Sequence, residues 1–110
     1  MNYTEMLNYV KENVDFKERL AQLAEEATEL AHAALKYRRS WDDENPTPVS
    51  PYDALADLLE EIDDVMLCLE VLDFEEHFNH QGERKPRKLI RWVKRLKEKS
   101  QKGDVDNAGR

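Results

Sequence analysis

Two groups of acidic side chains lie at spacings that could hold a metal ion. Glu25, Glu26 and Glu29 form the first group, and the run Glu60–Asp64 contains the second. At about 100° of rotation per residue, the three glutamates fall within one arc of about 100° on a helix. Carboxylates so close together repel one another unless a cation or a basic side chain neutralises them. Carboxylate oxygens suit hard cations, which favours Mg²⁺, with Mn²⁺ as the second choice.

The second acidic group divides by helix face. Glu61 and Asp64 flank the apolar stripe of their segment, whereas Glu60 and Asp63 point well away from it. Side chains at the edge of an apolar stripe lie where two packed helices meet, so they can converge with groups on the partner helix. The spacing therefore predicts a metal-binding set of Glu25, Glu26, Glu29, Glu61 and Asp64.

Other interpretations of the acidic residues stay open on spacing alone. An acid-rich helix face is often only solvated, with no ion bound. A ferritin-like di-iron bundle would use Glu-x-x-His motifs, and the run Glu29–His32 has that pattern. That architecture needs two such motifs, and the sequence contains one. His32 is therefore expected to be an ordinary surface or boundary residue.

Helices joined by short connections must position these groups. Capping patterns at Asn2, Asp15 and Ser50 each predict the start of a helix. Pro46 and Pro48 make their surroundings the clearest loop. The predicted elements are helices over 3–13, about 15–41 and about 50–73, a loop over 41–49, a short helix over 74–78, an interruption at 79–82, and a last helix from Pro86.

The chain of 110 residues is expected to form a single all-α domain, because two independent cores would each be too small. Apolar residues recur every three or four positions although 37% of the residues are charged. We predict an antiparallel helical bundle over residues 1–100 and a flexible tail over 101–110. Because one layer of helices buries little apolar surface, oligomerisation is expected to complete the bundle.

Charge and cysteine content narrow the class of protein. Up to His80 the chain carries 20 acidic and 6 basic residues, whereas from Gln81 onward it carries 4 acidic and 11 basic residues. No apolar run of about 18 residues is present, which predicts no membrane span, and the N-terminus lacks the pattern of a secretory signal. The single cysteine, Cys68, cannot form a disulfide within the chain. These features favour the reducing cytoplasm.

The two acidic groups and their surroundings resemble those of a known family. The run Ala24–Leu30 contains Glu-Glu-x-x-Glu, and the run Leu59–Val65 contains Glu-x-x-Asp. This ordered pair resembles the signature of the MazG-like nucleotide pyrophosphohydrolases, part of the all-α NTP pyrophosphatase superfamily that also includes the dimeric dUTPases. The short members from phages and Gram-positive bacteria look most similar. The resemblance covers residues 16–72 well and the basic last helix loosely.

The resemblance implies a reaction and a cofactor. Family members hydrolyse the α–β bond of nucleoside triphosphates with magnesium, releasing a monophosphate and pyrophosphate. A carboxylate that the metal does not saturate could accept the proton of the attacking water, with Glu26 and Glu29 as the candidates. The resemblance also implies a homodimer or a homotetramer in which helices of two subunits surround each site. The implied metal ligands are Glu25, Glu26, Glu29, Glu61 and Asp64.

Basic and aromatic side chains are candidates for binding the rest of a nucleotide. One lysine lies on the carboxylate face about two turns beyond Glu29, and three basic residues share one side of the last helix. Two aromatic residues near the loop could stack on a base. The candidates are Lys36, Lys88, Arg91 and Arg95 for phosphate, and Tyr37 and Trp41 for the base.

Two other functions stay open. The basic last helix could bind nucleic acid, although the whole chain has a net charge of -7 and carries no recognised binding motif. A helical partner or regulatory protein would keep the fold without catalysis. The sequence favours the enzyme over both alternatives, and metal-dependent release of pyrophosphate from a triphosphate would distinguish it from them.

Overall fold

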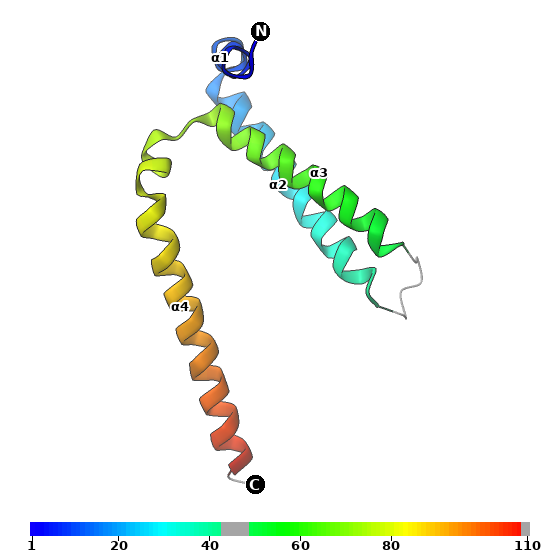
Figure 1. Cartoon of the computed structure of the whole chain (residues 1–110), viewed down its shortest axis with the longest axis vertical. Helices are drawn as coiled ribbons and strands as arrows, with labels where there is room; N and C mark the ends of the chain where they lie inside the picture. The colour runs from blue at the N-terminus through cyan, green and yellow to red at the C-terminus, as the bar shows by residue number, and fades with distance from the viewer. Residues whose placement is uncertain (43–48, 109–110) are drawn as a thin grey trace. The chain divides into compact units, whose positions relative to one another are not determined.

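The computed structural model describes residues 1–42 and 49–108, and of residues 75–81 and 104–108 it describes the backbone only. Within these ranges the chain forms α-helices and no strand, which confirms the predicted all-α class. Residues 43–48 of the predicted loop lie outside the described part. The helices, shown in Figure 1, are α1 (Tyr3–Asn13), α2 (Phe16–Arg39), α3 (Pro51–Leu72) and α4 (Glu75–Ala108).

The first three helices begin where the capping patterns predict, although only one predicted side-chain cap forms. The side-chain oxygen of Asn2 accepts the backbone N–H of Glu5 at 2.8 Å and so caps α1. Asp15 and Ser50 precede α2 and α3 without a side-chain bond to the helix. Pro51 occupies the first turn of α3, where its fixed φ angle favours the helix and its missing N–H is not needed.

Helices α2 and α3 form an antiparallel hairpin. Lys36 near the end of α2 forms an ion pair with Asp57 near the start of α3, with 3.3 Å between Nζ and Oδ2. At the other end, the Arg19 guanidinium at the start of α2 donates to the backbone carbonyl of Val71 at the end of α3. Contacts at opposite ends of the two helices require this antiparallel pairing, which is visible in Figure 1.

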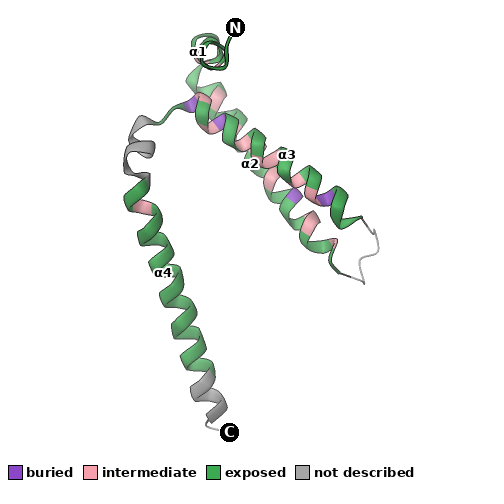
Figure 2. Ribbon diagram, in the orientation of Figure 1, coloured by how far each residue is buried: buried purple, intermediate pink, exposed green. Residues whose placement is uncertain are grey.

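The core of this hairpin is thin. Figure 2 shows how few positions along α2 and α3 are fully buried. Small side chains dominate the buried positions, so the helices approach closely without enclosing much apolar volume. Large apolar side chains such as Leu35 and Leu59 stay about half exposed, at 49% and 52%. The buried residues of the described part are Ala33, Ala54, Cys68 and Leu72.

Helix α1 packs against α3 and completes a three-helix unit, Met1–Asp73. The Tyr3 hydroxyl donates to the carboxylate of Glu70, and Lys11 forms an ion pair with Asp73 at 3.1 Å. Asp73 ends α3 in the left-handed conformation, with φ of 53° and ψ of 56°. Asp tolerates this conformation better than most residues other than Gly. These polar contacts of α1 therefore gather at the C-terminal end of α3, where the chain leaves the hairpin.

Helix α4 belongs to a second unit, Phe74–Arg110, and runs without a break through its described residues. The predicted interruption at 79–82 and the predicted start at Pro86 are wrong. Pro86 lies inside the helix and has no N–H to donate to the carbonyl of Gly82. The Glu, Lys, Arg and Leu residues around it are strong helix formers and outweigh this loss. The helix also continues to Ala108, through most of the residues predicted as a flexible tail.

Membrane crossing requires a helix that is both long and apolar. Among the described residues no helix satisfies both conditions. The longest, α4, is rich in Lys and Arg.

Candidate metal centre

Helices α2 and α3 bring three carboxylates together near the middle of the hairpin. Oxygens of Glu26, Glu29 and Glu61 all lie within 4.8 Å of one another. Glu26 and Glu29 are one turn apart on α2 and therefore share a face. Glu61 reaches them from α3 because it lies at the edge of that helix's apolar stripe. Glu26 and Glu61 are half-buried, and Glu29 is exposed.

These separations suit a single small cation. Mg²⁺ binds oxygen ligands at about 2.0–2.1 Å, so two ligands on opposite sides of the ion lie about 4.2 Å apart. The oxygens of the three glutamates lie at most 4.8 Å apart, which exceeds that distance only slightly. A small rotation about glutamate side-chain bonds closes the difference. The three carboxylates can therefore hold one octahedral cation, with water or phosphate oxygens in its remaining positions.

Each half-buried glutamate has one oxygen without a hydrogen-bond partner among the described residues. These atoms are Oε2 of Glu26 and Oε2 of Glu61, and both are buried. The other oxygen of Glu26 accepts from Nε2 of Gln22 at 2.9 Å. A buried carboxylate oxygen that has lost water and gained no partner destabilises the fold. A cation between the two helices would supply the missing partner for both oxygens.

Burial and mutual repulsion raise pKa values in the cluster. Burial raises the pKa of Glu61 above its ordinary value, and the charges of Glu29, Asp64 and Glu26 raise it further. Burial also raises the pKa of Glu26, followed by the charge of Glu29, while the hydrogen bond from Gln22 lowers it. A bound cation favours the ionised forms and opposes these shifts. The site is therefore electrostatically strained when it holds no cation.

The other two predicted ligands lie beside this cluster. Asp64 follows Glu61 by about one turn on α3, and its charge raises the pKa of both Glu26 and Glu61. Glu25 is exposed and is not part of the group of carboxylates found within the described residues. It precedes Glu29 by about one turn on α2, so the two share a helix face. The exposed Glu60 and Asp63 are also outside the group.

The predicted phosphate and base contacts of α2 lie farther along that helix. Lys36 is half-buried and is paired with Asp57. Tyr37 and Trp41 contact each other edge to face, with ring centroids 5.9 Å apart and planes at 61°. Tyr37 stands eight residues after Glu29, which is about 12 Å along the helix axis. The aromatic pair therefore lies near the loop end of the hairpin, away from the carboxylates.

The predicted phosphate contacts of α4 lie in the second unit. Lys88, Arg91 and Arg95 are all exposed and follow one another at helical spacing. Together with Trp92 they line one open hollow of about 350 Å³ on the surface of that helix. Their placement fits a solvated basic face as well as a phosphate-binding one.

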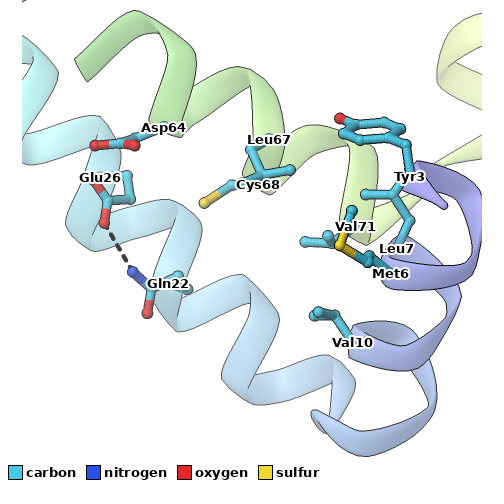
Figure 3. A pocket seen from close by; sticks show the side chains of 10 residues that line it. All are labelled: Tyr3, Met6, Leu7, Val10, Gln22, Glu26, Asp64, Leu67, Cys68 and Val71. Atoms are coloured by element: carbon cyan, nitrogen blue, oxygen red, sulfur yellow. Dashed lines mark hydrogen bonds between the residues drawn. The ribbon is translucent and has the colours of Figure 1, made fainter. Parts of the chain in front are cut away.

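A cavity next to the carboxylates was not predicted from the sequence. It has a volume of about 430 Å³ and is lined by residues of α1, α2 and α3. Glu26 and Asp64 line it together with apolar residues such as Met6 and Val71 (Figure 3). The apolar face of α1 was the only signal in the sequence, and helical spacing does not reveal what such a face packs against.

Comparison with known proteins found no matching family, no matching curated protein and no matching solved structure. The chemistry of the site is therefore argued from its own residues. An all-oxygen set of carboxylates on two helices favours a hard divalent cation over zinc or copper. Such a site can bind an anionic ligand through the metal and provide a carboxylate to accept a proton.

Proposed function

We propose that this chain is a metal-dependent nucleoside triphosphate pyrophosphohydrolase, which cleaves the α–β bond of an NTP or dNTP to give a monophosphate and pyrophosphate. The observation that carries the proposal is the pair of buried, unpartnered carboxylate oxygens of Glu26 and Glu61, in a cluster that Glu29 completes. Such a cluster needs a cation, and a triphosphate can approach an acidic site only through cations. The resemblance of both acidic motifs to the MazG-like family supports the same reaction.

In this proposal Glu26, Glu29 and Glu61 hold Mg²⁺ or Mn²⁺, and Glu25 and Asp64 are the remaining proposed members of the metal-binding set. The metal would neutralise phosphate charge and lower the pKa of a bound water. Water adds to one phosphorus of the α–β linkage and gives its proton to a carboxylate, and the bridging P–O bond at that phosphorus breaks. The other fragment leaves with the bridging oxygen and the electron pair, so that a monophosphate and pyrophosphate result. Glu26 and Glu29 are the two candidates for the base that accepts the proton of the water.

The cationic contact to the outer phosphates is assigned to Lys36. It is the nearest lysine along the carboxylate face of α2, and it pairs with Asp57 across a partly exposed gap. An exposed ion pair contributes only about 0–1 kcal/mol, so exchanging Asp57 for a phosphate costs little. Lys36 can therefore move between α3 and the substrate without disturbing the hairpin.

We also propose that the protein works as a homo-oligomer, a homodimer first and a homotetramer second. Large apolar side chains remain exposed on α2, α3 and α4 of the described part, and a second copy is the simplest cover for them. The acidic first unit and the basic α4 also have complementary charges. Sedimentation of the purified chain tests this proposal. The exposed apolar residues include Leu35, Leu59, Leu89, Trp92 and Leu96.

The free thiol of Cys68 is consistent with the cytoplasmic location that we propose. This thiol is buried, and burial raises its pKa, followed by the charges of Glu26 and Asp64. A buried, protonated thiol is a poor nucleophile and a packing residue. Cys68 is therefore given no part in the reaction.

The experiment that tests the function is pyrophosphate release by the purified full chain. The common NTPs and dNTPs, dUTP included, are supplied with Mg²⁺ and then with Mn²⁺, and EDTA serves as the control. We expect release from a subset of these nucleotides, lost with EDTA and restored by added metal. No release from a folded sample would contradict the enzyme and favour the non-catalytic partner.

A further inference from the structure

The cavity beside the carboxylate cluster has the size of a small-molecule site. Its volume of about 430 Å³ falls within the range of about 300–1,000 Å³ typical of ligand pockets. It lies within the three-helix unit, between α1 on one side and the α2–α3 hairpin on the other. Its walls come from three separate helices, so the cavity depends on how α1 docks and not on any single motif.

The lining changes from polar to apolar along the cavity. Figure 3 shows Glu26 and Asp64 at one end and the α1 residues Met6 and Val10 at the other, with Cys68 between them. Glu26 belongs both to this cavity and to the carboxylate cluster. A ligand that spans the two must therefore be apolar and compact at one end and anionic, bound through a cation, at the other.

A nucleotide has this division, because a flat aromatic base is joined through a sugar to a metal-binding phosphate chain. We propose that the cavity binds the base of the substrate while the triphosphate lies at the Glu26, Glu29 and Glu61 cluster. This inference rests on the proposed function, and it names where the protein contacts the base. The apolar lining, which includes Met6, Leu67 and Val71, would contact the ring on the open side of the cavity.

The hydrogen bond from Gln22 gives that residue a positioning role at the junction. Gln22 lines the cavity and donates to Glu26 Oε1 at 2.9 Å. The bond leaves Oε2 of Glu26 as the oxygen available to a cation. Gln22 thus connects the base cavity to the metal cluster through one glutamate.

The cavity is a better base site than Tyr37 and Trp41. The cavity adjoins the carboxylates directly through Glu26. The aromatic pair of Tyr37 and Trp41 lies about 12 Å or more from Glu29 in the direction of α2. The ion pair of Lys36 with Asp57 lies at the same loop end of the hairpin. The two locations make different predictions for single substitutions.

Filling the cavity tests the inference. Val71→Phe adds a ring to an apolar wall, and Met66→Phe is the matched control, because Met66 is on the same helix, is 59% exposed and does not line the cavity. Each full-length variant is titrated by calorimetry with Mn²⁺, with inorganic tripolyphosphate plus Mn²⁺, and with α,β-methylene analogues of UTP and ATP plus Mn²⁺. Tripolyphosphate carries the charge of the substrate without its base.

In the wild-type protein we expect at least one analogue to bind about tenfold or more tighter than tripolyphosphate, as contact of the base with an apolar lining implies. Val71→Phe is expected to remove that preference and to leave the affinities for Mn²⁺ and tripolyphosphate within about twofold, since the metal ligands are untouched. Met66→Phe is expected to retain the preference. Val10→Phe fills the cavity from α1 and serves as the second variant if Val71→Phe loses its helical circular dichroism.

The contrary outcomes separate the two proposals. If folded Val71→Phe and Val10→Phe both keep the preference, the cavity is not the base site, while the proposed function stands. Loss of the preference in Trp41→Ala alone would move the base to the aromatic pair. A changed sedimentation coefficient in Val71→Phe with the preference intact would show that a second copy occupies the cavity. If the wild-type protein fails to bind Mn²⁺, the proposed function fails and this inference fails with it.

Discussion

The two units of the molecule carry opposite charge in different ways. Met1–Asp73 contains 18 acidic and 6 basic residues, and Phe74–Arg110 contains 6 acidic and 11 basic residues. In the first unit, carboxylates from two helices converge and are partly buried. In α4 basic residues such as Arg91 and Arg95 stay exposed along one helix. Charge density is high in both units, but only convergence and burial create a demand for a counter-ion.

Solvent exposure explains this difference. Water screens like charges on an exposed face, so each interaction contributes about 0–1 kcal/mol. Partial burial weakens that screening, and burial is the largest cause of the raised pKa values of Glu26 and Glu61. A site in the first unit can therefore be detected by removing one carboxylate, whereas α4 should tolerate the loss of several charges.

The largest effect is expected from Glu61→Gln. Gln keeps the shape of Glu but not its charge, so we expect the rate of pyrophosphate release to fall by about a hundredfold or more. Loss of a residue that only orients a metal ligand costs about 10–100-fold, and loss of a ligand itself should cost at least as much. Glu60→Gln is the matched control, because Glu60 is the neighbouring residue on α3 and is exposed. Rates measured on both variants, with circular dichroism as the check of folding, decide the outcome. Full activity in Glu61→Gln would remove Glu61 from the site.

The next effect concerns pH and metal affinity. Protons compete with the cation for Glu26 and Glu61, whose pKa values are raised. We expect the affinity for Mn²⁺ to fall as the pH drops through these raised values, by up to about tenfold per pH unit for each proton displaced. Calorimetric titration between neutral and mildly acidic pH measures it. If the affinity for Mn²⁺ stayed constant down to the ordinary pKa of glutamate, the cluster would not be electrostatically strained.

A smaller effect is expected from α4. We expect the triple variant Lys88→Ala, Arg91→Ala, Arg95→Ala to change KM by less than about fivefold, the equivalent of about 1 kcal/mol for an exposed face. Steady-state kinetics of the full-length variant measures it, and Lys36→Ala, for which we expect a larger rise in KM, is the comparison. A large rise in KM with unchanged Mn²⁺ affinity would instead place α4 at the phosphate site.

The smallest effect is a change in stability without metal. A carboxylate whose pKa is raised in the folded state is stabilising when protonated, so its contribution is lost as the pH rises from the ordinary glutamate value through the raised one. In EDTA we therefore expect Glu61→Gln to melt a few degrees higher than the wild-type protein at neutral pH. The difference should shrink toward acidic pH and reverse with saturating Mg²⁺. Thermal melts across this range measure it, and a lower melting temperature for the variant in EDTA would contradict the strain.

Local structure was largely predictable from the sequence, with one clear failure. Caps and apolar periodicity act within a few residues, so the bounds of α1, α2 and α3 were predicted to within a residue or two. Gly82 and Pro86 each disfavour a helix when taken alone, and the break that they predict is wrong. Helix formation is cooperative, so the residues on both sides of Pro86 decided its conformation.

The order of the residues alone shows which carboxylates share a helix face, because rotation per residue is a property of any α-helix. It separated Glu61 and Asp64 from Glu60 and Asp63 without knowledge of a partner helix. Tertiary structure alone decided the rest. The register of α2 against α3 sets the separation of the carboxylate oxygens and their burial, and with them the raised pKa values. The docking of α1 forms the cavity. Such contacts depend on surfaces far apart in the chain, and no spacing within one helix encodes them.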